Sequence, residues 1–94
     1  MYKLSNKAAE DFEQIYEYTY LNFSENKADI YTDDMDKCLL LLSSSPQIGR
    51  SLDKIKKGVY RLDHEYHAIF YLIESSDIFI LRILHQQMNP LLHL

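Results

Sequence analysis

A chain of 94 residues with 47% hydrophobic and 26% charged residues has the composition of one globular domain, which excludes a disordered chain and a disulfide scaffold. The net charge of −4 excludes the overall basic character of a general nucleic-acid binder. The single cysteine, Cys38, excludes an internal disulfide. No signal-peptide pattern and no apolar run of about 20 residues are found, so we expect a cytoplasmic protein without a membrane span.

The first half of the chain predicts a short strand followed by two helices. Alternation over residues 2–5 predicts the strand, and Ser5 or Asn6 can cap a helix that runs to about Leu21. Ser24 can cap a second helix, and the run of serines before Pro46 is predicted to terminate that helix. Apolar residues at three- and four-residue spacing give each helix one inward face, so we expect an antiparallel helical hairpin. The predicted inward residues are Ala8, Phe12, Ile15, Thr19 and Phe23, then Ala28, Tyr31, Met35, Cys38 and Leu42.

The second half changes to the two-residue period of strands. Residues 59–63, 67–73 and 77–84 are rich in aromatic and β-branched side chains, and the turn Glu74-Ser75-Ser76-Asp77 separates the last two. Short links between successive strands predict an antiparallel meander. The whole chain, residues 1–94, is therefore predicted to be a single α+β domain of order β-α-α-β-β-β, with the helical hairpin on one face of a small antiparallel sheet.

The last strand is predicted to be apolar on both faces. Regular alternation would place Ile78, Ile80, Arg82 and Leu84 on one face, and Phe79, Leu81, Ile83 and His85 on the other. Two helices can cover only one face of the sheet. The other face is either a partner-binding surface or is closed by the N-terminal strand and the C-terminal tail.

Arg61 and Arg82 are the first candidate site residues, because each lies inside an otherwise apolar strand. If their strands flank one central strand, the two guanidinium groups converge on one surface, with Lys54, Lys56 and Lys57 nearby. Such a cluster can hold a phosphate group. The structural alternative is an internal ion pair for each arginine, with Asp63, Glu65 or Glu74 as its partner.

Charge is distributed unevenly along the chain. Residues 10–36 hold nine acidic side chains against Lys27, whereas residues 50–61 hold five basic side chains against Asp53. His64 and His67 lie at a predicted turn, but no third ligand stands at a recognisable spacing, so no metal site is predicted. We find no nucleophile or phosphate-loop motif, and predict no cofactor and no catalytic residue.

Four stretches of the chain are similar to a known family: "YKLSNKAAEDFEQIYEYTYLNFSENKADIY", "SSPQIGRSLDKIKKGVYRL", "HAIFYLI" and "ILRILHQQMN". Through them nearly the whole chain resembles the ParE-type toxins of the RelE/ParE superfamily of bacterial toxin–antitoxin modules. The order P-x-x-G-R, G-x-x-R, H-x-I-F-Y and R-I-L-H-Q-x-M is the most specific part of this resemblance. That family also has the β-α-α-β-β-β order that the periodicity predicts.

The resemblance implies a toxin that binds a cognate ParD-like antitoxin in a hetero-oligomer and poisons DNA gyrase without being a catalyst. RelE-like members instead cut messenger RNA in the ribosome, with basic residues and a tyrosine near the C-terminus. Here no tyrosine follows Tyr71, which disfavours the ribonuclease even though His85 could take that place. A third hypothesis is a degenerate member that binds only its antitoxin. The candidate partner-binding residues are Arg61, Arg82, His85 and Met88.

Overall fold

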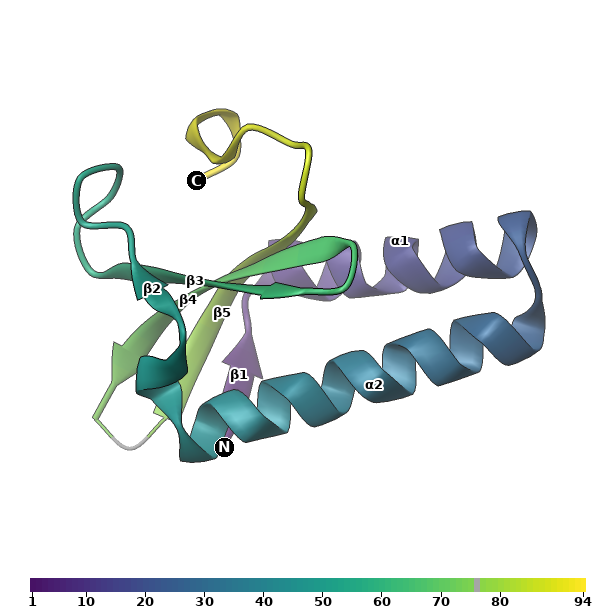
Figure 1. Cartoon of the computed structure of the whole chain (residues 1–94), viewed down its shortest axis with the longest axis horizontal. Helices are drawn as coiled ribbons and strands as arrows, with labels where there is room; N and C mark the ends of the chain where they lie inside the picture. The colour runs from purple at the N-terminus through teal and green to yellow at the C-terminus, as the bar shows by residue number, and fades with distance from the viewer. Residues whose placement is uncertain (76) are drawn as a thin grey trace.

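The computed structural model describes residues 1–75 and 77–94. Two helices are followed by most of a five-stranded sheet, and the chain ends in a short 3-10 turn, Pro90–Leu92 (Figure 1). The α+β class and the predicted helical hairpin are confirmed. Within the described residues, no helix combines the length and apolar character that crossing a membrane requires.

Both helices begin where the sequence predicts. In α1 (Asn6–Asn22) the Ser5 hydroxyl accepts a hydrogen bond from the Ala8 N–H, and in α2 (Glu25–Ser44) the Ser24 hydroxyl accepts one from the Lys27 N–H. Each serine oxygen thereby satisfies a backbone donor that the first helical turn leaves without a partner. The predicted inward positions largely hold, but Phe23 is wrong, since it follows α1 and its side chain is exposed.

The sheet contains the predicted strands and one that was missed. Its order is β1-β5-β4-β3-β2, made of β1 (Tyr2–Leu4), β2 (Arg50–Ser51), β3 (Val59–His64), β4 (His67–Glu74) and β5 (Asp77–His85). β1 lies parallel to β5 and the other pairs are antiparallel, so the sheet is mixed and not wholly antiparallel as predicted. The two-residue strand β2 is too short to produce an alternation pattern. Of the predicted β4–β5 turn, Ser76 lies outside the described residues.

A bulge in β5 corrects the predicted faces of that strand. Phe70 pairs with Arg82, but the next residue of β4, Tyr71, pairs with Ile80, so Leu81 is the extra residue. The Ser5 hydroxyl donates to the Leu81 carbonyl at 2.7 Å, which ties the start of α1 to the bulge. Ile80 and Ile83 consequently share the helix-covered face, whereas regular alternation had separated them.

The two faces of the sheet carry separate apolar clusters. On the helix side, Ile69, Tyr71 and the isoleucines of β5 pack against buried residues of both helices, and the half-buried Cys38 joins them. We call the opposite side the open face. Its cluster consists of Val59, Ala68, Phe70 and Leu84, with Leu52, Leu72, Leu81 and Leu94 packed against it. In Figure 1, α2 lies below the sheet and the C-terminal segment lies above it.

Candidate partner-binding site

Three arginines are aligned across the open face. The strand register pairs Arg50 with Arg61, Arg61 with Phe70, and Phe70 with Arg82. Residues directly opposite each other in a sheet point to the same side, so these four side chains form one row. The row crosses four strands, and it brings Arg61 and Arg82 to one surface on either side of a central strand.

Arg61 is held in place by Asp63 on its own strand and by Phe70 in the row. Its Nε donates to the Asp63 carboxylate at 2.9 Å, and its guanidinium carbon lies 5.3 Å from the centre of the Phe70 ring. A nitrogen of Arg50 lies 3.6 Å from the same carboxylate. Asp63, one of the three acids predicted as ion-pair partners, therefore screens two arginines that would otherwise repel each other.

Arg82 pairs with Asp11, which was not among the predicted partners. Two nitrogens of its guanidinium donate to the two carboxylate oxygens of Asp11 at 2.8 and 2.9 Å. The Ile83 N–H donates to the same carboxylate at 3.0 Å. The hydrogen bonds from the guanidinium to Asp11 raise the pKa of Arg82 above its ordinary value. Because β1 pairs only with residues 78–80, α1 lies beside the rest of the β5 edge and brings Asp11 there.

Asp11 is the main residue of the candidate site that the sequence did not lead us to predict. It stands among the inward positions Ala8, Phe12 and Ile15 of α1, and the residue is only 8% exposed. An acid within an apolar helix stripe and an arginine within an apolar strand each predict a buried partner of opposite charge. Considered together, these two anomalies would have predicted the pair.

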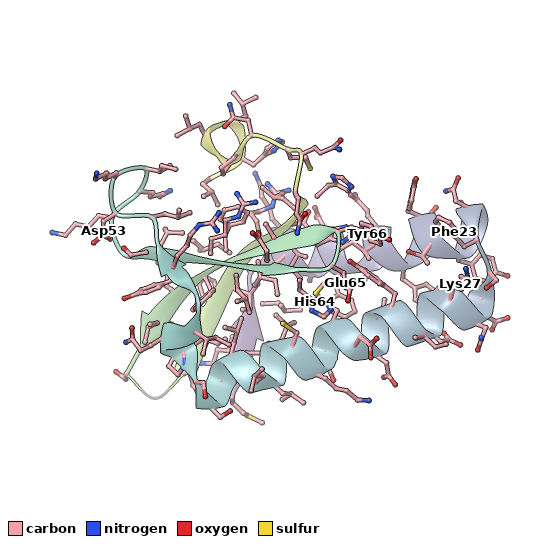
Figure 2. All side chains as sticks on the ribbon, in the orientation of Figure 1. Phe23, Lys27, Asp53, His64, Glu65 and Tyr66 are labelled. Atoms are coloured by element: carbon pink, nitrogen blue, oxygen red, sulfur yellow. The ribbon has the colours of Figure 1, made fainter. Side chains whose placement is uncertain are left out.

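The basic loop between β2 and β3 borders the same face. Lys54, Lys56 and Lys57 are exposed there, and Leu52 at the start of the loop packs against the open-face cluster. Gly58 closes the loop with a φ of +82°, a conformation that favours glycine, and its N–H donates to the Asp53 side chain at 2.8 Å. In Figure 2, Asp53 marks this loop at the end of the molecule far from Phe23 and Lys27 on the helical hairpin.

His85 lies apart from the arginines. It pairs with His67, and His67 pairs with His64, so these three histidines form a second row on the helix-covered side. His85 is exposed at the end of β5, and Met88, 38% exposed, lies in the turn that follows, where its backbone N–H donates to the His85 carbonyl. The structure thus places Arg61 and Arg82 on the open face, His85 on the other side of the sheet, and Met88 in the turn after β5.

The histidine row is closed by α2. The Tyr31 hydroxyl lies 2.6 Å from Nδ1 of His67, and the Tyr31 ring is tilted against both His64 and His67. Burial, together with the nearby His85 and His64, lowers the pKa of His67 from 6.5 to about 4. In the part of the chain that the structure describes, no three His, Cys, Asp or Glu side chains gather closely enough to hold a metal ion.

The motifs that carry the resemblance meet around one tyrosine. Tyr71 ends the H-x-I-F-Y motif, and its hydroxyl donates to the Pro46 carbonyl at 2.7 Å and accepts from the Gly49 N–H at 3.1 Å. A Cβ at Gly49 would overlap that hydroxyl. The P-x-x-G-R motif therefore fixes the connection from α2 to the start of β2, where Arg50 enters the arginine row.

Comparison with known proteins finds relatives over nearly the whole chain. The family described as "ParE toxin of type II toxin-antitoxin system, parDE" matches residues 2–90. Toxin ParE1 of Mycobacterium tuberculosis is 30% identical over 89 residues, which cover 94% of this chain and 91% of the relative. Toxin ParE1 of Caulobacter vibrioides is 27% identical over 93 residues, covering 99% and 96%.

A solved structure also matches in fold. One chain of the "Chromosomal ParDE TA system from P. aeruginosa" superimposes with a TM-score of 0.77 at 24% identity, over 89% of this chain and 92% of that chain. The chain belongs to the ParE toxin family of type II toxin–antitoxin systems.

Proposed function

We propose that this protein is a cytoplasmic toxin that inhibits DNA gyrase and is neutralised by a cognate ParD-like antitoxin in a hetero-oligomer. The family match over residues 2–90 carries this proposal, since it covers all the strands and both helices. The antitoxin is further supported by the structural relative, which is part of a ParDE system. Exposed apolar side chains in the loop and the C-terminal segment that border the open face, Ile55, Leu91 and Leu92, support a protein partner of this kind.

The arrangement of the histidines disfavours the ribonuclease alternative. Cleavage through a 2′-hydroxyl needs a base beside the groups that hold the phosphate. The phosphate-holding candidates, Arg61 and Arg82, extend from the open face, whereas the histidines of the strands extend from the opposite side. A base at His85 would act from the wrong side of the sheet. The arginine row itself is the one observation that favours the ribonuclease, so both activities are tested.

The first experiment is DNA supercoiling by purified gyrase in the presence of this protein, on a gel that also resolves cleaved DNA. We expect supercoiling to stop and linear DNA to accumulate. No effect at large molar excess, with cleavage of ribosome-bound messenger RNA instead, would replace the gyrase proposal by the ribonuclease. Absence of both activities, with antitoxin binding retained, would support the degenerate toxin.

A variant pair tests the proposed contact residues in the same assay. Met88→Ala removes an exposed side chain from the turn after β5, and we expect weaker gyrase inhibition without loss of folding. Leu91→Ala, also exposed and three residues later, is the matched control. Arg82 is less suitable for this purpose, because its replacement also leaves the buried Asp11 carboxylate without its oppositely charged partner.

A further inference from the structure

The chain's own C-terminal residues already lie on the open face. The side chain of Leu94 packs against the cluster of Phe70 and Leu84, and Nη1 of Arg82 donates to the His93 carbonyl at 3.3 Å. Figure 1 shows the C-terminal segment crossing above the strands on the side away from α2. An aliphatic side chain and a backbone acceptor are therefore the groups that this surface binds within its own molecule.

The C-terminal segment is held only weakly. Its backbone hydrogen bonds join Leu92 to Asn89, and His93 and Leu94 to Pro90, so they stabilise the turn and not its attachment to the sheet. Leu91 and Leu92 are 64% and 78% exposed. Leu94 packs against the open-face cluster and a long hydrogen bond joins Arg82 to the His93 carbonyl, so the segment has few contacts with the sheet, as locally unstable elements do.

The charges around this surface favour an acidic occupant. Arg50, with a side chain 62% exposed, stands at one end of the arginine row, and the three lysines of the β2–β3 loop border it. The carboxylates nearby, Asp53 and Asp63, are fewer than these cations. A chain whose total charge is −4 therefore presents a locally positive rim around an apolar floor.

We infer that the open face binds an extended segment of a partner protein in which acidic residues flank an aliphatic one, and that residues 90–94 must leave for it to bind. The inference rests on the proposed function, in which that partner is the antitoxin. An apolar floor gives no advantage to a phosphate backbone, so a protein segment fits better than a nucleic acid. Residues 90–94 act as an internal competitor, which lowers the apparent affinity by the fraction of molecules in which they are bound.

The test uses the full chain and three fluorescent probes: a peptide of alternating leucine and glutamate, the same peptide with lysine in place of glutamate, and a single-stranded oligonucleotide. Binding is followed by fluorescence anisotropy. We expect Leu94→Ala to bind the glutamate peptide several-fold more tightly, up to roughly tenfold, because the competitor is weakened. Leu92→Ala, in the same turn but exposed, is the matched control and leaves the affinity unchanged.

A second pair of variants tests the charge. Arg50→Gln should weaken binding of the glutamate peptide several-fold, and less at high salt, whereas Lys37→Gln on α2 should not. The inference fails if Leu94→Ala weakens or does not change binding, or if the lysine peptide binds as well as the glutamate peptide. Tighter binding of the oligonucleotide would replace the protein partner by a nucleic acid. Gyrase is absent from this assay, so a failure here leaves the supercoiling result standing, and the reverse holds too.

Discussion

Phe70 and Tyr71 are neighbours on the central strand, and both are almost completely buried, yet they belong to different kinds of surface. Tyr71 faces two helices and anchors the α2–β2 connection through its hydroxyl. Phe70 faces an arginine, a loop and the last residues of the chain. Equal burial therefore does not mean burial by the same kind of element. The 94-residue chain places both helices on one face and covers the other with a loop and the C-terminal segment.

The largest expected effect comes from Asp11, because its ion pair with Arg82 joins α1 to β5. Asp11→Ala should destabilise the protein by about 3–5 kcal/mol, because Arg82 would remain largely buried without its partner. The measurement is the free energy of unfolding in urea. Glu13→Ala, exposed on the same helix, is the control and should change it by less than about 0.5 kcal/mol. A small effect of Asp11→Ala would mean that the pair does not hold α1 to β5.

A second prediction compares the two faces through the same substitution. Leu39 and Leu84 are both buried, the first between helix and sheet and the second on the open face. Leu39→Ala should cost about 2–5 kcal/mol of unfolding free energy, and Leu84→Ala at least about 1 kcal/mol less, because the C-terminal segment can settle into the space. Equal costs in urea unfolding would show that the open face is packed as rigidly as the helix side.

The smallest expected effect is a pH dependence of the free energy of unfolding, which we assign to His67 on the helix-covered side of the sheet. The pKa of His67 is lowered to about 4 in the folded state, so between about 6.5 and 4 the unfolded chain binds a proton that the native chain does not. The free energy of unfolding therefore falls as pH falls through this window, by at most about 1 kcal/mol per pH unit, since the ring is only partly buried.

His67→Asn should flatten that slope. Urea unfolding at several pH values between 4 and 7 gives the measurement, and an unchanged slope in His67→Asn would assign the dependence to another group.

The sequence was informative wherever structure depends on neighbouring residues. Ser5 and Ser24 lie directly before their helices, and the strand residues alternate, so the caps and the three long strands could be predicted. The bulge at Leu81 could not be predicted, because the Ser5 hydroxyl that donates to the Leu81 carbonyl lies 76 positions away in the sequence. The same holds for Asp11 and Arg82. The arginine row needed both the strand order and the register, including β2, which has no pattern of its own.

The parallel pairing of β1 with β5 has a consequence for when the chain can fold. A protein is synthesised from its N-terminus, and β1 and α1 are therefore complete long before residues 77–85 exist. Until then β1 has no strand to pair with, and Asp11 has no Arg82. Contacts between distant parts of a chain form late and slowly. A chain that ends before residue 77 therefore lacks β5, the strand that pairs with both β1 and β4, and it cannot form the sheet described here.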